Sequence, residues 1–288
     1  MTGDKKDLLI KVSFCGVETT CHVIICGSGR PLVCLHGIGS SGWNTFSGIV
    51  PHLSSQFTLV IIDWLGFGKS SVHLRKVDTY SASYLTEWLA AVLKEFEENR
   101  IALHPFSFLA GSMGSLGVML LHLRGLQPVG PSIFVNPAGF SKRINFWFAS
   151  SLANPLFPVI SLARLAANSQ FVWQRILGWD AEKQEWLKDG LADGRFEVLL
   201  RYVRAGILPW GGMKKTHIIR DRVRELNFPV VLVYGENDTH FPTNDYLTYG
   251  AELPHASVIK LSDVGHNVFT KKPEELSRII KQFFNQIS

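Results

Sequence analysis

The sequence has few of the features that mark secreted, membrane-spanning or disordered chains. Only 18% of its 288 residues are charged and 46% are hydrophobic, which excludes a disordered, collagenous or coiled-coil protein. No uninterrupted run of roughly 18 uncharged apolar residues is present, because Asn and Pro interrupt the most apolar stretch, residues 144–163. The first residues also lack the apolar segment of a signal peptide. We therefore expect a cytoplasmic protein without a transmembrane segment.

Cysteine is scarce, and its few positions do not form a metal motif. Their spacings give no Cys-x-x-Cys pairs and no paired histidines follow, so we expect no zinc site. Free thiols in early strands, in a reducing compartment, are the simplest interpretation. The four positions all lie near the start of the chain: Cys15, Cys21, Cys26 and Cys34.

The net charge of +5 is unevenly distributed along the chain. Residues 140–225 hold 14 Lys and Arg residues against 8 Asp and Glu residues, whereas the rest of the chain is close to neutral. No Arg- and Lys-rich stripe with interleaved aromatic residues forms a recognised motif, so we expect no nucleic-acid partner. The basic residues of this segment favour a solvated face, or one that contacts anionic substrates or lipid: Arg201, Arg204, Lys214, Lys215, Arg220, Arg222 and Arg224.

Short apolar runs alternate with helix-length segments, which predicts an α/β protein with a parallel sheet. Buried parallel strands are nearly continuous apolar runs. We expect such strands at residues 31–35, 58–62, 106–110, 132–135, 230–234 and 257–261, after an antiparallel pair at 11–14 and 21–26. Helices are expected at residues 84–96, 115–123 and 273–287, the last with Pro in its first turn.

The alternation of strands and helices stops between residues 139 and 225. This segment holds five of the eight tryptophans, and its hydrophobic periodicity is mostly helical. We interpret it as a helical insert over the sheet. The predicted organisation is a core formed by residues 1–139 and 226–288, with residues 140–225 as the insert.

Residues 37–42 (GIGSSG) follow a predicted strand and match a dinucleotide-binding fingerprint, with Asp63 about 21 residues on. Two features argue against a nucleotide. His36 directly precedes the first glycine, where a pyrophosphate turn has little room for a bulky side chain. Asp63 also begins a second glycine-rich turn, residues 63–70, that a ribose site does not need. That turn is not a phosphate-binding loop either, because its earlier glycine is missing.

A second small-residue turn, residues 110–114 (AGSMG), connects a predicted strand to a predicted helix. A nucleophile elbow needs this arrangement, because its serine occupies a strained turn with small residues two positions before and after it. Ser112 is therefore the candidate nucleophile. Ser115 is the rival, but it lies inside the predicted helix.

A nucleophilic serine needs a base, and the base needs a group that orients it. Asp238 follows the predicted strand 230–234, and His266 follows the strand 257–261. Catalytic groups of open α/β sheets gather at the carboxyl ends of the strands. Asp238 and His266 are therefore the candidate acid and base. The rival acids are Glu236, Asp245 and Asp263.

The complete pattern resembles the α/β-hydrolase superfamily over nearly the full chain. Residues 36–39 look like its oxyanion loop, and residues 63–70 look like its D-x-x-G-x-G-x-S turn. Residues 110–114 look like its nucleophile elbow, and residues 235–238 and 265–266 look like its acid and base turns. The resemblance implies a mostly parallel eight-stranded sheet flanked by helices, with residues 140–225 as a helical cap after the sixth strand.

The resemblance also implies a mechanism that needs no cofactor and no metal. Ser112 attacks an acyl carbonyl, His266 moves the proton, and Asp238 orients and stabilises the His266 imidazole. The backbone N–H groups of Met113 and of Ile38 (or Gly39) form the oxyanion hole. We expect His36 to be a buried structural residue.

Several classes of hydrolase share this layout. A serine at position 112 argues against epoxide hydrolases and haloalkane dehalogenases, which use Asp. Residues 39–43 and 63–70 look closest to the meta-cleavage-product C–C hydrolases, but those carry Asn before the serine and Trp after the histidine, where this chain has Gly111 and Asn267. We favour a carboxylic-ester hydrolase acting on a small molecule. The alternatives are a C–C hydrolase, a thioesterase or acyltransferase, and a non-catalytic binding protein.

The predicted cap is rich in aromatic residues, which either pack between its helices and the sheet or form the roof of an apolar pocket. A roof of rings favours esters with short to medium acyl chains or aromatic groups. Trp147 and Phe171 are the two candidates for substrate contact. The full set is Phe140, Phe146, Trp147, Phe148, Phe157, Phe171 and Trp173.

Overall fold

The computed structural model describes residues 5–72, 80–102, 104–144, 188–189, 191–206 and 214–287. An eight-stranded sheet with the order β1-β2-β4-β3-β5-β6-β7-β8 forms its centre. The β1–β2 and β2–β4 pairs are antiparallel, and all other neighbours are parallel. The strands are β1 (Lys6–Phe14), β2 (Val17–Gly27), β3 (Arg30–Leu35), β4 (Phe57–Ile62), β5 (Phe106–Gly111), β6 (Val129–Val135), β7 (Val230–Gly235) and β8 (Ala256–Leu261).

This arrangement confirms the predicted α/β-hydrolase fold class. Every expected strand is present, and the observed bounds of most strands differ from the predicted bounds by no more than a few residues. The largest difference is in the opening pair, where β1 begins well before residue 11. Its outer face is exposed, Leu9 included, so the first half of β1 lacks the continuous apolar run that marks a buried strand.

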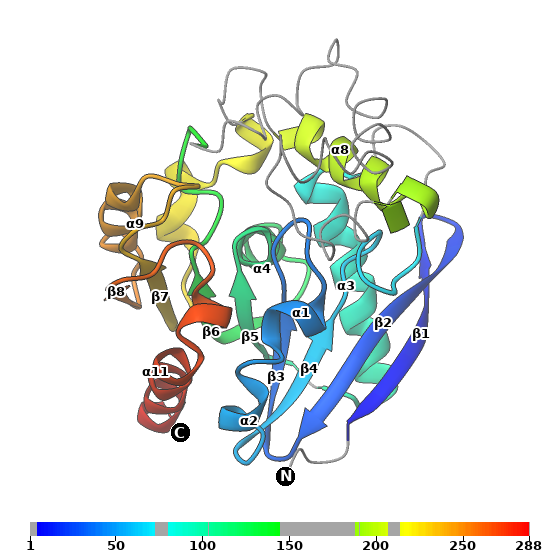
Figure 1. Ribbon diagram of the computed structural model, residues 1–288, viewed down its shortest axis with the longest axis horizontal. Helices are drawn as coiled ribbons and strands as arrows, with labels where there is room; N and C mark the ends of the chain where they lie inside the picture. The colour runs from blue at the N-terminus through cyan, green and yellow to red at the C-terminus, as the bar shows by residue number, and fades with distance from the viewer. Residues whose placement is uncertain are drawn as a thin grey trace.

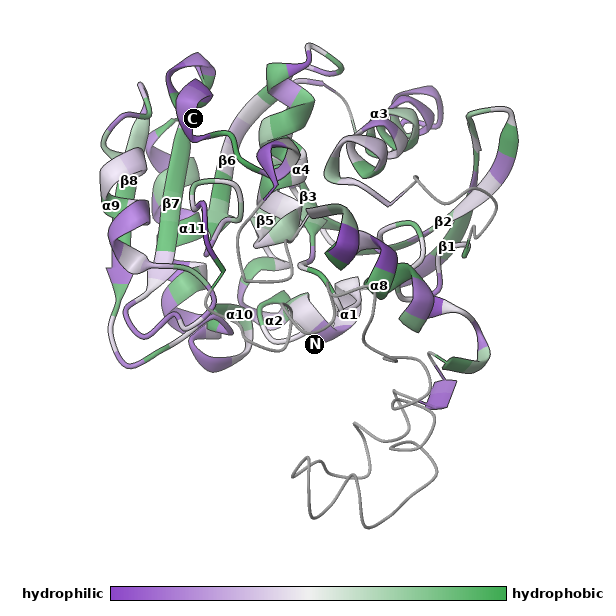
Figure 2. Ribbon diagram, turned by 90° about the horizontal axis from the view of Figure 1, so that it is seen from above, coloured by the Kyte–Doolittle hydropathy of each residue, from purple (hydrophilic) through white to green (hydrophobic). Residues whose placement is uncertain are grey.

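Alternate residues of each central strand face two separate layers of helices. Val33 and Val60 pack in a core with α3 (Ala82–Glu98) and α4 (Met113–Leu123), whereas Cys34 and Ile61 pack in the other core. That second core includes side chains of α1 (Gly42–Phe46), α2 (Val50–Leu53), α10 (Val268–Lys271) and α11 (Pro273–Gln286). Figure 1 shows these layers on either side of the sheet. In Figure 2 the strand β7 is hydrophobic along most of its length, as a strand buried on both faces must be.

The helix α3 lies within two residues of its predicted position, because its apolar residues have a clear helical spacing. Leu85, Trp88, Leu89 and Val92 recur at helical spacing, and all four are buried against the sheet. The Ser81 hydroxyl accepts a hydrogen bond from the Tyr84 N–H at 3.2 Å and thereby begins the helix.

Part of the predicted insert is described. It contains the helix α8 (Arg195–Gly206) and the short 3₁₀ helices η2 (Lys215–His217) and η3 (Arg220–Glu225). Figure 1 shows α8 above the edge of the sheet at which the parallel strands end. The Ile219 N–H donates to the Gly139 carbonyl at 2.8 Å, which joins the two ends of the segment. Trp147 and Phe171 lie outside the described residues.

Asp63 is a buried structural carboxylate, and it explains both glycine-rich turns. Its oxygens accept hydrogen bonds from the Gly42 N–H at 2.6 Å and the Lys69 N–H at 2.9 Å, and they lie 2.6 Å from His22 Nδ1. A Cβ at Gly68, which has a φ of 52°, would overlap this carboxylate. The Asp63 carboxylate is therefore bonded to groups of the protein itself. This agrees with the argument from the sequence that it does not bind the ribose of a dinucleotide.

None of the helices in the described part of the chain has the length and apolar composition needed to cross a membrane.

The basic residues after α8 are largely involved in surface ion pairs. Arg222 lies 2.6 Å from Glu225, and Arg224 lies 3.4 Å from Glu252. Such pairs partly neutralise the excess positive charge of this segment.

Candidate active site

Ser112 occupies a strained turn between β5 and α4. Its φ of 49° and ψ of −116° fall outside the regions that non-glycine residues prefer, at a cost of roughly 1–3 kcal/mol. The surrounding backbone holds this conformation: the Ser112 N–H donates to the Val135 carbonyl at 2.9 Å, and the Ala138 N–H donates to the Ser112 carbonyl at 3.1 Å. Strain of this kind at the end of a parallel strand is typical of a nucleophile elbow.

The small residues around Ser112 are needed because the backbone passes close to its neighbours. A Cβ at Gly114 would overlap the Leu35 carbonyl oxygen, and one at Gly37 would lie 3.1 Å from the Ser112 Cβ. A Cβ at Gly111 would lie 2.6 Å from the Phe269 ring. The short spacing of small residues in the sequence therefore reflects the tight approach of β3, the elbow and α10.

The rival serine has a structural environment. Ser115 is fully buried within α4, and its hydroxyl donates to the Ala110 carbonyl at 2.8 Å. This bond closes the elbow against the end of β5. Ser112, by contrast, lines a cavity.

Asp238 and His266, which are 28 residues apart, meet beyond the ends of β7 and β8. The His266 Nδ1 lies 3.1 Å and 3.0 Å from the two carboxylate oxygens of Asp238. A neutral imidazole that donates from Nδ1 has its Nε2 as an acceptor. Such a histidine can take a proton from a nearby hydroxyl group, and it lines the same cavity as Ser112.

The Asp238 carboxylate has several hydrogen-bond donors. Burial alone would raise its pKa, but bonds from His266, from the His240 N–H at 2.8 Å and from the Tyr246 hydroxyl at 2.9 Å hold that pKa below its ordinary value. Asp238 is therefore ionised near neutral pH. It is suited to hold the His266 ring and to stabilise an imidazolium.

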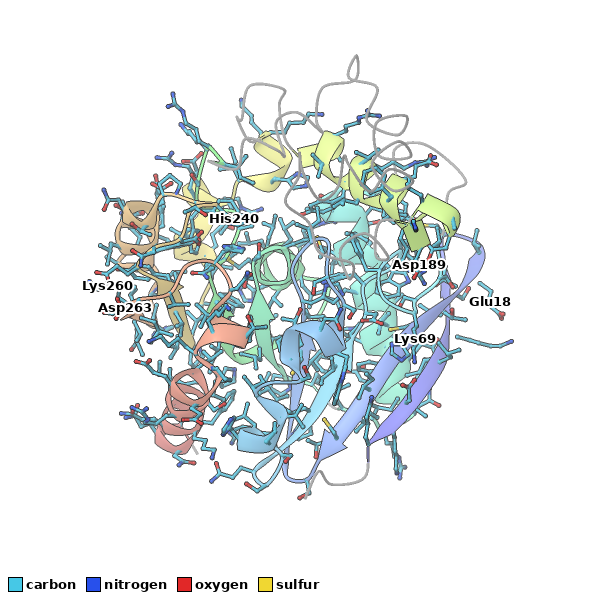
Figure 3. The ribbon with its side chains drawn as sticks, viewed as in Figure 1. Glu18, Lys69, Asp189, His240, Lys260 and Asp263 are labelled. Atoms are coloured by element: carbon cyan, nitrogen blue, oxygen red, sulfur yellow. The ribbon has the colours of Figure 1, made fainter. Side chains whose placement is uncertain are left out.

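The rival acids lie in different surroundings. Glu236 is exposed and pairs with Lys260 at 2.7 Å. Asp263 is exposed and lies with Lys260 at the periphery in Figure 3. Asp245 is in the first turn of α9 (Thr243–Gly250), where a carboxylate is favoured by the helix dipole. Of these four acids, all within the described residues, Asp238 is the one hydrogen-bonded to His266.

The predicted oxyanion donors lie on two sides of Ser112. Met113 begins α4, and the first N–H groups of a helix have no partner within it. Ile38 and Gly39 follow β3 and line the cavity with Ser112 and Met113. The helix dipole of α4 adds positive potential at this position.

His36 orients the predicted oxyanion loop, residues 36–39, through buried hydrogen bonds. It is fully buried, and burial lowers the pKa of its imidazole, so the ring is neutral. Its Nε2 accepts the Trp64 N–H at 3.2 Å, and its Nδ1 therefore donates to the Gly37 carbonyl at 2.7 Å. Because C=O and N–H point in opposite directions across a trans peptide, this bond directs the Ile38 N–H away from His36. The expected structural role of His36 agrees with these contacts.

A cavity of about 410 Å³ connects the candidate residues. Ser112 and His266 lie on its sheet side, and Leu199, Tyr202 and Val203 of α8 lie on the opposite side. Within the described part of the chain, its lining includes no Lys, Arg, Asp or Glu side chain. The described wall is therefore apolar with a few neutral polar groups, as in sites that bind small organic molecules.

One wall residue gives a pH-dependent stability that can be measured. Burial, and to a smaller extent the nearby Lys214, lowers the pKa of His217 to about 4. An unfolded chain binds this proton at its ordinary pKa of roughly 6.5, so stability is lost as pH falls from that value towards 4, by about 3 kcal/mol. Denaturant unfolding of wild type and His217→Gln across this range measures the difference. The exposed His255→Gln serves as control, and equal slopes for all three proteins would contradict the assignment.

Asn136 is a residue of the candidate site that the sequence analysis did not identify. It is buried, with a φ of 43°, at the end of β6. Its side-chain amide donates to the His266 carbonyl at 2.8 Å, and its side-chain oxygen accepts the Gly235 N–H at 2.9 Å. Asn136 thus connects the turn that carries Asp238 with the turn that carries His266. A positive φ at a single Asn has no signal in the sequence.

Asp238, His240 and His266 are also spaced closely enough to be considered as metal ligands, with ligand atoms within 4.8 Å of one another. Their orientation argues for a different use. The two imidazoles stack with only 20° between their planes, so their in-plane lone pairs lie in nearly parallel planes instead of converging on one point. The geometry is better explained by the pairing of His266 with Asp238.

Comparisons with known proteins agree with this fold. A family model described as "alpha/beta hydrolase fold" matches residues 30–273. The chain is 26% identical over 266 residues to a pimeloyl-[acyl-carrier protein] methyl ester esterase of Aeromonas hydrophila, covering 89% of this chain and 96% of that protein.

Solved structures show the same fold. An α/β-hydrolase-fold protein from Burkholderia ambifaria has a TM-score of 0.74 at 19% identity, over 97% of this chain and 99% of that chain. A meta-cleavage product hydrolase from Pseudomonas fluorescens has a TM-score of 0.72 at 18% identity, over 97% and 98% of the two chains.

Proposed function

The chain belongs to the α/β-hydrolase-fold family, and from this premise we propose that it is a serine hydrolase that cleaves carboxylic esters of small molecules. The observation that carries the proposal is the strained Ser112 on the same cavity as a His266 that is bonded to Asp238. The esterase from Aeromonas hydrophila supports ester chemistry, because it aligns over nearly its whole length.

In the proposed mechanism, Ser112 Oγ attacks the ester carbonyl carbon while His266 Nε2 takes its proton. The tetrahedral intermediate then collapses, and His266 gives the proton to the leaving alcohol. Water attacks the acyl-enzyme with His266 again as the base, and the carboxylic acid leaves. Asp238 holds the imidazole in one tautomer throughout and stabilises its charged form.

The developing oxyanion is held by two backbone donors in this proposal. These are the Met113 N–H at the start of α4 and the Ile38 N–H, which the bond between His36 and Gly37 directs away from the protein interior. Donors that are already oriented stabilise the charge without reorganisation during the reaction. A donor of this kind is worth roughly 10²–10³ in kcat.

The cavity supports an uncharged acyl group of short to medium length. Its volume of about 410 Å³ is at the lower end of small-molecule sites, and its described lining has no Lys, Arg, Asp or Glu side chain. We propose that residues 140–225 form the cap over it, with Trp147 and Phe171 extending the apolar wall. The core is then formed by residues 1–139 and 226–288.

Gly111 weakens the alternative of a C–C hydrolase of the meta-cleavage-product type. The Phe269 ring occupies the space into which a side chain at position 111 would project. The Asn that precedes the serine in that subfamily would require Phe269 to move. We therefore keep ester hydrolysis as the function.

The direct test is hydrolysis of p-nitrophenyl esters of graded chain length. We expect kcat/KM to rise with each added CH₂ by about 0.8 kcal/mol of binding until the cavity is full, and then to fall. Val203→Phe, which adds volume inside the cavity, is expected to shift the preferred ester to a shorter chain. Ala205→Phe, on the same helix but outside the cavity lining, is the control for added bulk.

The chain-length series separates the possible outcomes. Absence of hydrolysis for every ester would refute the proposed function. An unchanged profile in Val203→Phe would instead show that the acyl group lies elsewhere.

A further inference from the structure

His240 lies directly against the proposed base. Its ring stacks on the His266 imidazole, with 4.1 Å between the ring centroids and 20° between the planes. Its backbone N–H donates to Asp238 Oδ1 at 2.8 Å, so one residue contacts both the acid and the base. His240, labelled in Figure 3, also lines the cavity that contains Ser112.

We propose that His240 is a positioning residue, whose ring holds the His266 imidazole in its reactive orientation and stabilises the imidazolium formed during the reaction. The inference rests on the proposed function, because it concerns the same base. It goes beyond that function in assigning a fourth side chain to the catalytic unit.

The first support is the way the His266 ring is enclosed. Asp238 holds one edge of the ring at Nδ1, and His240 covers one face. Phe241 contacts the ring at a tilt of 57°, with 5.8 Å between the centroids. Rotation of the imidazole about its last side-chain bond would break the stack and the Asp238 bonds together. The stack therefore restricts the ring to the orientation that leaves Nε2 for Ser112.

The second support is the charge state of His240. Burial, and the neighbouring His266, lower the pKa of His240 to about 4, so its ring is neutral near pH 7. A cation is attracted to the face of a neutral aromatic ring, and the attraction grows when the pair is shielded from water. A neutral His240 thus favours the imidazolium of His266, which forms as Ser112 attacks.

Other groups that face this pair are consistent with the assignment. Asp238 is the carboxylate at its edge, and its Oδ1 lies 3.8 Å from His240 Nδ1. Tyr246 packs from α9 with its hydroxyl on Asp238, and burial followed by that carboxylate raises the pKa of the hydroxyl well above its ordinary value. Phe241 is uncharged. Among the described residues in contact with the pair, Asp238 supplies the negative charge and His240 supplies the ring face.

A matched pair of variants tests the inference. His240→Phe keeps an aromatic face over His266, whereas His240→Leu keeps the bulk that excludes water but removes the face. For Leu we expect kcat to fall about 2- to 30-fold, and the acidic limb of the kcat/KM profile to move to lower pH by about 0.4 to 1.5 units. The acidic limb moves to lower pH because the His266 imidazolium, without the aromatic face of His240, holds its proton less tightly. For Phe we expect values near wild type.

An NMR titration of the His266 ring in Ser112→Ala protein tests the same inference without ester hydrolysis. The His240→Leu change should lower the His266 titration midpoint by the same interval, and His240→Phe should not. Equal effects of Leu and Phe, in either measurement, would overturn the role of the ring face. A failure of the proposed function would leave wild type without esterase activity but would not alter the NMR comparison. Circular dichroism melting identifies any variant that has not folded.

Discussion

Replacement of Ser112 by Ala is expected to lower kcat for p-nitrophenyl ester hydrolysis by about 10³- to 10⁶-fold, with the fold retained. In the proposed mechanism the serine hydroxyl forms the acyl-enzyme, so its removal prevents that step. Its strained backbone does not depend on the hydroxyl, because the Ser112 N–H and carbonyl make the bonds that hold the turn. Initial rates at saturating ester, with circular dichroism of both proteins, measure the two effects.

Ser115→Ala is the matched control for this prediction. The Ser115 hydroxyl donates to the Ala110 carbonyl inside the fold, so its removal should lower stability by about 1–3 kcal/mol and leave most of the activity. A fluorophosphonate probe should label Ser112 in wild type and in Ser115→Ala. Labelling of Ser115, or more than a tenth of wild-type activity in Ser112→Ala, would refute Ser112 as the nucleophile.

Replacement of Asp238 by Asn is expected to lower kcat by about 10⁴-fold. The Asn side chain fills nearly the same space but can present an N–H to His266 Nδ1, which favours the wrong imidazole tautomer. It also removes the negative charge that stabilises the imidazolium, in a site where Asp238 is almost completely shielded from water. Stopped assays over a range of pH measure the loss.

Glu236→Gln is the control for the acid. Glu236 is two residues away, exposed and paired with Lys260, so its loss should leave kcat within about a factor of two, as for a surface ion pair of small energy. If Glu236→Gln and Asp238→Asn lost activity equally, the assignment of the acid would be wrong. A loss of stability on acidification that is as steep in Asp238→Asn as in wild type would also contradict it. The lowered pKa of Asp238 contributes stability above its ordinary pKa that is lost as pH falls through the folded value.

Several features of the fold were readable from the sequence because they depend on local chemistry. A parallel strand buried on both faces has to be apolar along its length, so β7 and the other central strands could be located within three residues. A sharp turn that passes close to backbone has to be built from small residues, which marked the elbow. The helices α1, α2, α9 and α10 were missed, because helices of 4 to 8 residues are too short to show a hydrophobic period.

The sequence by itself determined the order of the candidate nucleophile, acid and base, and the strand after which each one lies. Only the tertiary structure decided that Asp238, and not Glu236 two residues earlier, meets His266. It alone decided that His240 stacks on that ring and that Asn136 connects the two turns. These contacts join segments that are far apart in the chain, or depend on the direction of a single side chain in a turn. The energy of these contacts depends on distances between atoms that are set only when the strands have packed. The order of residue types along the chain does not specify those distances.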